Sequence, residues 1–424
     1  MHSKNYSRRG LIKTVSSIGA GVVLSPYAKA SSGGERLLSE IQQRSVQYFY
    51  DQADPYTGLI RDRARNSYAE DHRIVASIAA TGFGLSALAI GNRKGYISRP
   101  EAFERVHRTL EHLARRRDHV HGFYYHFMDM RTGDRAWNSE VSSVDTAWLL
   151  CGVLHARAHF DSPRIDSLAT EILDRVDWQW MTNGGDLLSH GWTPERGFLP
   201  YRWDSYSELM AMYLLAIGAK NSPLPAKSWD VWHRPVRSYE GMRWIDSDTP
   251  LFTHQYSHAF FDFRDRRDRY ADYFLNSRLA TEAHRLHCMA LSKHLPSYGP
   301  NLWGVTASDS RQGYSPWGGF DSRPGYDGTI VPCAAGGSLP FSPEHCMAVL
   351  ETAFDKFGVR VWGRYGFNDA FHPHANWTSP DVIGINLGIM LTMAENLRTG
   401  AVWEAMMSTP EAQRGMAAVG LLRS

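Results

Sequence analysis

The sequence has little cysteine, little net charge and no long hydrophobic run. Its 424 residues include only 4 Cys, which excludes a small scaffold held together by disulfides. Lys and Arg number 46 against 44 Asp and Glu, so there is no basic field to hold a nucleic-acid backbone. No apolar run in the body of the chain reaches the roughly 20 residues that a helix needs to span a bilayer. The 43% hydrophobic and 21% charged residues are typical of a globular protein.

The first 30 residues have the features of an export signal. They carry five basic residues and no acidic one. Ser7-Arg8-Arg9-Gly10-Leu11-Ile12-Lys13 is a twin-arginine pattern, and a short apolar stretch through Leu24 leads to the small-residue cleavage site Ala28-Lys29-Ala30. We expect residues 1–30 to be removed and residues 31–424 to form a periplasmic or secreted domain without a membrane anchor. Removing five positive charges from a net +2 leaves a mature chain near −3.

The twin-arginine route carries proteins that have already folded in the cytoplasm, which bears on the cysteines. We therefore expect Cys151, Cys288, Cys333 and Cys346 to be buried thiols rather than disulfide partners. Cys333 and Cys346 are close enough in sequence to pair after export, and the sequence leaves that question open.

Apolar residues recur at helical spacing along most of the chain. Strand alternation is scarce, and no linker rich in Pro, Gly or Ser divides the sequence. These patterns favour one all-α domain. Paired helices that close into an (α/α) toroid would fit them, and a helical solenoid is the competing architecture. The clearest helices are predicted at 35–51, 72–91, 98–116, 142–159, 163–180, 205–219, 267–294, 343–357 and 380–398, with weaker candidates at 225–237, 253–263 and 402–419.

Four long segments between these helices are unusually aromatic: 121–138, 190–204, 302–341 and 363–377. Loops of this length are uncommon unless they are functional or disordered, and the aromatic content argues against disorder. Any single ring could simply pack beneath its loop. Taken together, the four segments favour one shared aromatic cleft.

Motifs for cofactors and metals are weak. Gly82-Phe-Gly84-Leu-Ser-Ala87 matches a dinucleotide-binding pattern, but a helix rather than a strand is predicted before it, so we interpret it as small residues that allow close helix packing. His284 and His287 would share a helix face without a third ligand. The groups His119/His121/His126 and His372/His374 are as consistent with polar pocket lining as with a metal site. We predict no cofactor and no metal.

Carboxylates are the stronger chemical candidates. Glu140, Asp145, Glu208, Asp369 and Asp381 all lie in or at the ends of the aromatic segments. Hydrolysis of an acetal needs one acid to protonate the leaving oxygen and a second to activate water or attack the sugar carbon. Aromatic rings offer flat apolar faces on which sugar rings stack. The competing interpretation is structural: Asp145 and Glu208 would complete capping boxes that start at Ser142 and Ser205, and Asp381 would interact with a helix dipole.

Several longer segments resemble the glucoamylase-like family, which includes the bacterial β-1,2-glucanases of glycoside hydrolase family 144. The resemblance runs from about residue 38 to the C-terminus. The segments that carry it are Thr81-Gly-Phe-Gly-Leu-Ser-Ala-Leu-Ala-Ile-Gly91, Ser139-Glu-Val-Ser-Ser-Val-Asp-Thr-Ala147, Gly191-Trp-Thr-Pro-Glu-Arg-Gly197, Tyr206-Ser-Glu-Leu-Met210, His254-Gln-Tyr-Ser-His258, Gly304-Val-Thr-Ala-Ser-Asp309 and Tyr365-Gly-Phe-Asn-Asp-Ala-Phe371.

The resemblance implies an (α/α)6 barrel with a cleft across one end. It also implies hydrolysis of β-1,2-linked glucose polymers by inversion, without a metal or organic cofactor. The family's general acid matches Glu208, and further pocket acids match Glu140 and Asp145, with Asp369 or Asp381 near the last inner helix. An inverting enzyme needs carboxyl groups about 6.5–9.5 Å apart, or a relay through water or a sugar hydroxyl.

Residue chemistry and resemblance together give a specific hypothesis. Glu208 protonates the glycosidic oxygen, and one of Glu140, Asp145 or Asp369 activates water. Arginines bind sugar hydroxyls and tryptophans stack on sugar rings. The expected substrate-binding residues are Arg61, Arg135, Trp192, Arg202, Trp203, His254, Gln255, Trp303, Asp309, Trp377 and Asp381.

Two alternatives stay open at this stage. The enzyme could hydrolyse another glucan or transfer glycosyl groups, or the chain could be a periplasmic glucan-binding protein whose acids only cap helices. The partner in each case is a glucan, and we expect the protein to act as a monomer. Endo and exo action cannot be distinguished, because loops at the ends of a cleft decide between them.

Overall fold

The computed structural model describes residues 32–115, 119–321 and 325–423. The export signal predicted at residues 1–30 lies outside these ranges. Within them, no helix combines the length and the apolar character needed to cross a membrane.

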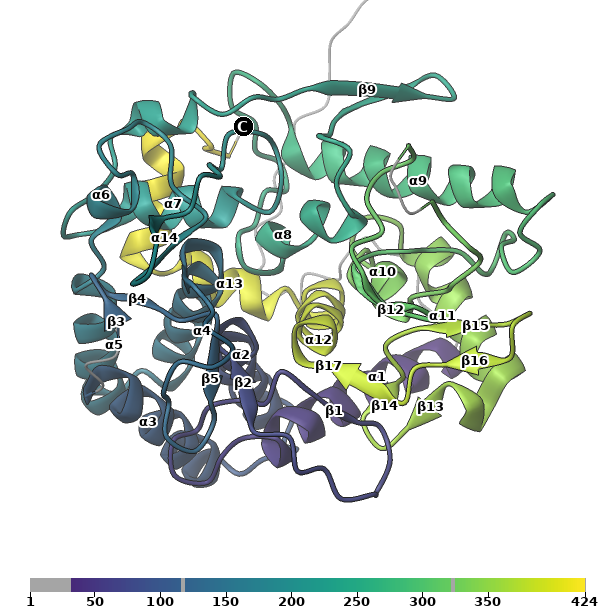
Figure 1. Cartoon of the computed structure of the whole chain (residues 1–424), viewed down its shortest axis with the longest axis horizontal. Helices are drawn as coiled ribbons and strands as arrows, with labels where there is room; N and C mark the ends of the chain where they lie inside the picture. Colours follow the sequence, from purple (N-terminus) through teal and green to yellow (C-terminus); the bar gives the residue numbers. More distant parts are fainter. Residues whose placement is uncertain (1–31, 116–118, 322–324, 424) are drawn as a thin grey trace, which may run out of the picture.

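Helices packed in a closed circuit form the centre of the described structure (Figure 1). Along this circuit α2 packs against α4, α4 against α7, α7 against α8, and α12 against α8, α10 and α2. Between α8 and α10, Nε2 of Gln255 donates a 2.9 Å hydrogen bond to the carbonyl oxygen of Ala334. The six helices are α2 (Ile78–Arg93), α4 (Ser143–Phe160), α7 (Met210–Gly218), α8 (Tyr256–Phe260), α10 (Pro332–Gly336) and α12 (Gly384–Arg398).

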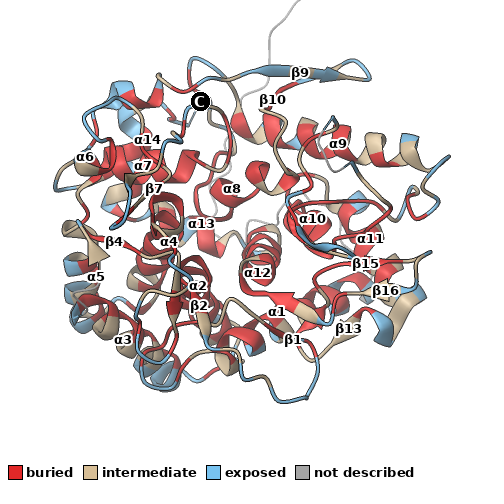
Figure 2. Cartoon of the chain, in the orientation of Figure 1, coloured by how far each residue is buried: buried red, intermediate tan, exposed pale blue. Residues whose placement is uncertain are grey.

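Their composition explains their central position. A helix that is apolar around its whole circumference is stable only when it is surrounded by protein. In α2 every residue from Ile78 to Gly91 is buried, and in α7 every residue from Met210 to Gly218 is buried. Figure 2 shows these central helices almost entirely in the colour of buried residues.

A second set of helices surrounds the circuit, with one buried and one exposed face (Figure 2). In α3, buried Ala102, Val106, Leu110 and Leu113 recur at a spacing of three or four residues, which marks one face of a helix. The molecule is therefore mostly helical, with an inner and an outer layer as in an α/α toroid. The outer helices are α1 (Ser32–Asp51), α3 (Arg99–Arg115), α5 (Pro163–Asp174), α9 (Tyr273–Leu291), α11 (Pro343–Phe357) and α14 (Pro410–Ala418), and the shorter ones are α6 (Trp178–Met181), α13 (Ala401–Met407) and the 3-10 turns η1 (Ala226–Trp229), η2 (Leu251–His254) and η3 (Gly358–Arg360).

Glycines allow the inner helices to approach closely. A Cβ atom on Gly82 would lie 2.3 Å from the carbonyl oxygen of Trp148 in α4, and one on Gly152 would lie 2.0 Å from the carbonyl oxygen of Gly82. Both distances are far shorter than a van der Waals contact. Gly82 and Gly84 therefore serve helix packing, as predicted, because the segment is the interior of α2 rather than a phosphate-binding loop.

Short strands replace much of what the sequence suggests is loop. They pair antiparallel, and β6, β7 and β8 form one sheet; β7 and β8 belong to the second aromatic segment, and a bridge between Tyr125 and Val141 of β6 connects this sheet to the first. The other pairs are β1–β17, β2–β5, β3–β4, β9–β10, β11–β12, β13–β14 and β15–β16. Their bounds are β1 Arg63–Arg65, β2 Val75–Ser77, β3 His119–Val120, β4 Phe123–Tyr124, β5 Phe127–Asp129, β6 Val141–Ser142, β7 Gly191–Thr193, β8 Gly197–Phe198, β9 Val236–Tyr239, β10 Met242–Ile245, β11 Ser308–Ser310, β12 Gly313–Ser315, β13 Trp362–Gly363, β14 Gly366–Phe367, β15 Phe371–His372, β16 Trp377–Thr378 and β17 Asp381–Ile383.

Strand pairing explains two of the errors in the predicted helix boundaries. The helices predicted at 72–91 and 380–398 begin later, at Ile78 and Gly384, because β2 and β17 pair with β5 and β1 instead. The helix predicted at 205–219 begins only at Met210. Region 163–180 divides into α5 and α6, region 402–419 into α13 and α14, and region 253–263 into η2 and α8, while region 225–237 holds only η1 and the start of β9. The short helix α10 was not predicted.

All four cysteines are free and buried, as the sequence predicted. Cys333 lies in α10 and Cys346 in α11, and they form no disulfide with each other. Burial raises the pKa of each thiol, so at neutral pH these side chains are uncharged apolar core groups.

Candidate active site

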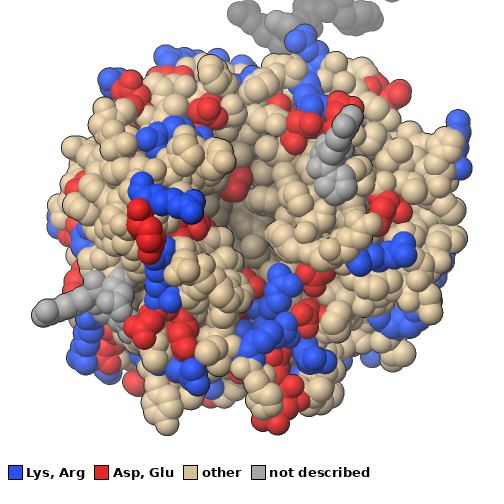
Figure 3. Space-filling model, viewed as in Figure 1, with Lys and Arg blue, Asp and Glu red and all other residues tan. Residues whose placement is uncertain are grey.

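The face of the molecule toward which the inner helices begin is hollowed near its middle (Figure 3). Strands β2, β6 and β17 lead directly into α2, α4 and α12, so the paired strands gather at this end. Acidic side chains are visible in and around the hollow, and a mixed group of basic and acidic side chains lies beside it over β1 and β17. The end with the loops therefore carries both a cavity and a concentration of charge.

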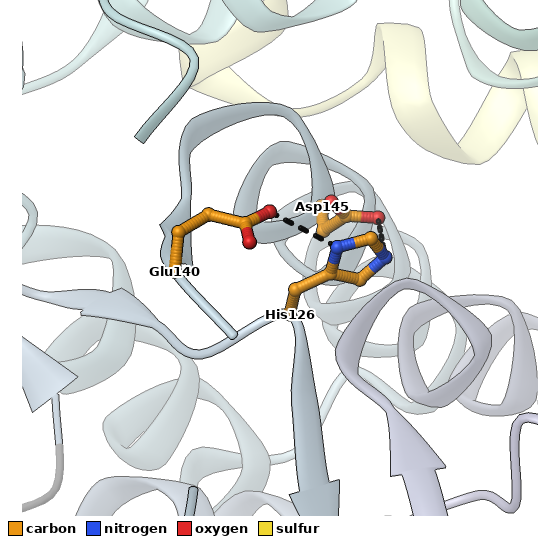
Figure 4. Close-up of side chains that lie close together, drawn as sticks. All are labelled: His126, Glu140 and Asp145. Carbon is orange, nitrogen blue, oxygen red and sulfur yellow. Dashed lines mark hydrogen bonds and ion pairs between the residues drawn. The ribbon is translucent and has the colours of Figure 1, made fainter. Parts of the chain in front are cut away.

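His126, Glu140 and Asp145 form a compact group at this end (Figure 4). Nδ1 of His126 lies 3.1 Å from Oε1 of Glu140, and Nε2 of the same ring lies 3.7 Å from Oδ1 of Asp145. Asp145 is in the first turn of α4, where Ser142 caps the helix by accepting a hydrogen bond from the Asp145 amide. The backbone amide of His126 donates to the Glu140 carbonyl oxygen at 2.9 Å. Sequence-local capping and strand pairing thus bring the three side chains together.

The charges in this group reinforce one another. Burial alone would lower the pKa of His126, but the carboxylates of Asp145, Glu140 and Asp62 outweigh it and raise that pKa to about 9. Burial would raise the pKa of Glu140, but the hydrogen bond and charge of His126 dominate and lower it. At neutral pH His126 is therefore an imidazolium that forms an ion pair with the Glu140 carboxylate.

The same three residues are the one group in the described ranges whose ligand atoms lie close enough together to hold a metal ion. A metal would need a ring nitrogen of His126 without its proton. With both nitrogens facing carboxylates and a pKa of about 9, a proton competes strongly for that position near neutral pH.

Glu208 lies in a different environment. It precedes α7, which begins at Met210 without a side-chain cap, so the capping box predicted at Ser205 does not form. The hydroxyl of Ser257 donates to the Glu208 carbonyl oxygen at 2.9 Å and fixes the backbone. Loss of hydration, with a smaller contribution from the negative charge of Asp145, raises the pKa of Glu208 to about 7. No basic side chain in the described ranges forms an ion pair with it.

A second acidic group contains Asp369 and Asp309. The Asp309 amide donates to Oδ2 of Asp369 at 2.7 Å, and Nδ2 of Asn386 donates to Oδ1 at 2.7 Å. Burial, together with the charge of Asp309, raises the pKa of Asp369 to about 7. Asp309 itself is held by Arg63 at 2.8 Å and by the Ser379 hydroxyl at 2.8 Å. Both oxygens of Asp369 are thus occupied by protein donors.

Asp381 lies in β17 rather than in the first turn of a helix, so the helix-dipole interpretation is wrong for it. Its carboxylate binds the guanidinium of Arg73 at 2.6 and 3.0 Å. Arg73 also binds Asp71, and Arg61 lies 4.0 Å from Asp71 and donates to Gln52 at 2.6 Å. These residues form an ion-pair network.

Several expected substrate-binding residues are buried. Trp303 is fully buried, and Trp203 is buried with its indole N–H on the Ser143 hydroxyl at 2.8 Å. His254 contacts the Tyr206 hydroxyl at 3.1 Å, and Gln255 ties α8 to α10. None of these four presents a free face to a ligand in this structure.

The remaining expected residues are more accessible. Trp192 in β7 and Trp377 in β16 are partly exposed. Arg202 donates to the Leu199 carbonyl oxygen. Arg135 binds Glu195 and two backbone carbonyls of its own loop. It therefore connects the first two aromatic segments, and its guanidinium is already engaged by protein acceptors.

Sequence reasoning underestimated His126 and did not single out Asp62 or Arg63. His126 was considered only as one of three neighbouring histidines. The signal available in the sequence was that His126 lies in the aromatic segment that ends just before Glu140, and Glu140 follows His126 by fourteen residues. Arg63 was harder to find, because its partner Asp309 is 246 residues away in sequence.

Comparison with known proteins identifies the family. A family model described as "Putative glucoamylase" matches residues 200–410. A crystal structure of a protein from Bacteroides fragilis described in the same terms is 30% identical, with a TM-score of 0.86, and the match covers 94% of this chain and 100% of that one. The chain belongs to the glucoamylase-like family of glycoside hydrolases.

Two relatives have names that give their substrate as a β-1,2-glucan or its oligosaccharides. The endo-β-1,2-glucanase of Chitinophaga pinensis, solved with sophorotriose and glucose, is 29% identical with a TM-score of 0.84, over 93% of this chain and 99% of that chain. An exo β-1,2-glucooligosaccharide sophorohydrolase of Parabacteroides distasonis is 28% identical over 423 residues. The match covers 90% of this chain but only 57% of that relative, so the chain spans little more than half of the curated relative's length. The family resemblance inferred from the motifs is confirmed.

Proposed function

We propose that this glucoamylase-like protein is an exported glycoside hydrolase that cleaves β-1,2-glucan by general acid/base catalysis with inversion. The named relatives support the substrate class. The observation that carries the mechanism is the difference between two carboxyl environments: Glu208 has no cationic partner among the described residues, whereas Glu140 and Asp145 share the His126 imidazolium.

This difference assigns the two chemical roles. With a pKa near 7, Glu208 keeps its proton over much of the acidic to neutral range and can donate it to the glycosidic oxygen. Glu140 and Asp145 face the His126 imidazolium, which lowers the pKa of Glu140, so one of these two carboxyl groups accepts a proton from water. The charge of Asp145 contributes to the raised pKa of Glu208, so the proposed acid lies close enough to the His126 group to feel its charge. The arrangement thus separates an acid from a base at one pH.

The proposed hydrolysis needs no reactant other than the glucan and water. The proton of Glu208 moves to the glycosidic oxygen as the bond from that oxygen to the anomeric carbon breaks. The oxygen of water bonds to the anomeric carbon from the opposite face, and its proton passes to the carboxylate of the His126 group. Asp369 does not act as the base in this scheme, because both its oxygens accept hydrogen bonds from the protein. Its role is to hold Asp309 and the backbone of β11.

The helix contacts support an (α/α)6 barrel as the finer description of the fold. Contacts between the six inner helices, together with the hydrogen bond from Gln255 to Ala334, close a circuit, and the six long outer helices provide one candidate partner for each. We propose that the hollow at the end where the inner helices begin is the substrate cleft.

Export through the twin-arginine route is a further part of the proposal. It rests on Ser7-Arg8-Arg9 and the cleavage site at Ala28-Lys29-Ala30. Replacing Arg8 and Arg9 together by Lys should leave the protein in the cytoplasmic fraction of a producing cell, whereas the unaltered chain should appear in the periplasm or medium, cleaved after Ala30 and monomeric by sedimentation. The same distribution between cell fractions for the unaltered chain and the double Lys variant would contradict twin-arginine export.

The activity is tested with linear β-1,2-glucan and the variant Glu208→Gln. We expect the unaltered protein to release β-1,2-linked oligosaccharides, and Glu208→Gln to lose at least about 10²-fold in kcat while still binding the polymer. Parallel reactions with β-1,3- and α-1,4-glucans should give no comparable product. Saturable binding by the unaltered protein without new reducing ends would instead establish a glucan-binding protein.

A further inference from the structure

Trp137 combines two unusual features. Its side chain is 68% exposed, which is a large exposure for so apolar a ring. Its backbone has φ +54°, and the next residue, Asn138, has φ +52°. Two successive residues in the left-handed region are uncommon, and a bulky side chain there is a true outlier. The fold thus holds a large apolar ring in solvent on a strained backbone.

Core packing does not explain this conformation. A residue strained by its surroundings is normally buried and held there by neighbouring atoms, whereas most of the Trp137 side chain is in solvent. Strained, exposed residues are enriched where a ligand is bound. The loop also lies just before Glu140, one of the candidate catalytic acids.

The loop that carries Trp137 is fixed on both sides. The guanidinium of Arg135 donates to the carbonyl oxygens of Asn138 at 2.7 Å and Ser139 at 2.5 Å, and it binds the Glu195 carboxylate at 2.6 and 3.0 Å. The loop is thereby attached to the segment between β7 and β8. The position of the ring is therefore defined by the protein before any ligand arrives.

A continuous line of rings connects Trp137 to the candidate acids. The centroids of Trp137 and Phe127 are 5.0 Å apart, and Phe127 stacks on His126 at 3.9 Å with an angle of 16° between the planes. His126 in turn contacts Glu140 at 3.1 Å. Trp137 is therefore the outer end of a row that begins at the reacting groups.

We propose that Trp137 is a sugar-stacking platform that binds a glucose unit of the polymer outside the linkage being cleaved. A pyranose presents an apolar face of C–H groups that packs on an indole ring, and burying both surfaces stabilises the complex. The ligand is the same β-linked glucan that the proposed function assigns as substrate, so this inference rests on that function. Because the ring lies beyond Phe127 and His126, it contacts long chains and not the short ones that fill only the central positions.

Three variants test the platform: Trp137→Ala, Trp137→Gly and Trp137→Phe. For polymeric β-1,2-glucan we expect Ala and Gly to raise KM by about 10-fold, with kcat within about 2-fold, because one stacked ring contributes on the order of a tenfold change in affinity. Trp137→Phe retains a ring and should stay within about 3-fold of the unaltered protein. For sophorotriose all four proteins should have similar KM. Titration of the polymer into the same variants made in the Glu208→Gln background measures binding without turnover.

The glycine variant separates binding from folding. Glycine adopts positive φ without strain, so Trp137→Gly should melt at or above the temperature of the unaltered protein while losing polymer affinity. A lower melting temperature with KM raised equally for polymer and trisaccharide would show a structural role and overturn the proposal. Unchanged polymer affinity in Trp137→Ala would also overturn it. Failure of the unaltered protein to cleave β-1,2-glucan would instead reject the proposed function, and this outcome is distinguishable because polymer binding is measured separately.

Discussion

Nδ1 of His126 lies 3.1 Å from Oε1 of Glu140, and this contact determines how the candidate acids share protons. The other ring nitrogen faces Asp145 at 3.7 Å, so one imidazolium serves two carboxylates. Glu208 has no such partner in the described ranges. A cation beside Glu140 and away from Glu208 lowers the pKa of the first acid and lets the second retain its proton.

Replacing His126 should move the acidic side of the pH–activity profile. In His126→Asn the charge that lowers the pKa of Glu140 is gone, so burial raises that pKa and a higher pH is needed to ionise the carboxylate. We expect the acidic limb of kcat/KM to shift upward by about one pH unit and activity at pH 5 to fall by up to about 10-fold. The measurement is kcat/KM on β-1,2-glucan between pH 4 and 9.

A histidine outside the site provides the control for this variant. His345 on α11 lies 3.5 Å from Glu282, and α11 is on the opposite side of the molecule from α4, which carries Asp145 (Figure 1). His345→Asn should leave the profile unchanged. An acidic limb in His126→Asn that coincides with that of the unaltered protein would show that His126 does not control Glu140.

The basic limb of the same profile should report Glu208. Its pKa is raised to about 7, first by loss of hydration and then by the charge of Asp145. Because the acid must be protonated to act, kcat/KM should decline as the pH rises through about 7. Asp145→Asn removes one cause of the raised pKa, so the basic limb of its residual activity should move to lower pH. A limb that moves to higher pH would contradict the assignment.

Asp369 should make stability depend on pH. Its pKa is about 7 in the folded chain, first because of burial and then because of Asp309, and near its ordinary value of 3.8 when unfolded. The folded form therefore binds the proton more tightly, and stability should fall as pH rises from about 4 through 7.

The neutral variant Asp369→Asn isolates this effect. Its amide can still accept one hydrogen bond but cannot ionise, so its melting temperature should decline less between pH 5 and 8 than that of the unaltered protein. Thermal unfolding by circular dichroism at several pH values is the measurement. Parallel curves for the two proteins would show that Asp369 is not the group responsible.

Adding a side-chain atom where α2 and α4 are in close contact should destabilise the fold. In Gly82→Ala the new Cβ would lie 2.3 Å from the carbonyl oxygen of Trp148, and a backbone atom cannot move aside as a side chain does. We expect a loss of about 2–4 kcal/mol in the free energy of unfolding. Gly299→Ala is the matched control, because a Cβ there meets nothing within 4 Å. Equal stability of the two variants in urea would mean that the helices separate without cost.

Local patterns in the sequence predicted much of the helical framework. Helices 35–51, 98–116, 142–159 and 343–357 agree with α1, α3, α4 and α11 to within a few residues. Their apolar spacing and first-turn residues act within one or two helical turns, so they are visible in the sequence. Pro343 in the first turn of α11 is one such signal.

Boundaries were wrong where a distant strand competes for the backbone. The start of α12 is delayed because Asp381–Ile383 pairs with Arg63–Arg65, more than 300 residues earlier. The helix expected from Ser205 does not begin there, so Glu208 is not a capping residue. Periodicity cannot detect either effect, because Asp381–Ile383 pairs with a distant strand and Ser205 forms a bridge with His233, outside its own helical window.

Scarce cysteine, near-zero net charge, an export-type N-terminal segment and acids among aromatic residues could all be recognised in the sequence by itself. Those properties depend on which residues are present and in what local order. Only the tertiary structure decided which acids share an environment. It placed His126 between Glu140 and Asp145, left Glu208 without a cation among the described residues, and buried Trp303 while exposing Trp137. The physical reason is that a pKa and the exposure of a ring depend on distances and solvent access in space, which packing of the whole chain sets.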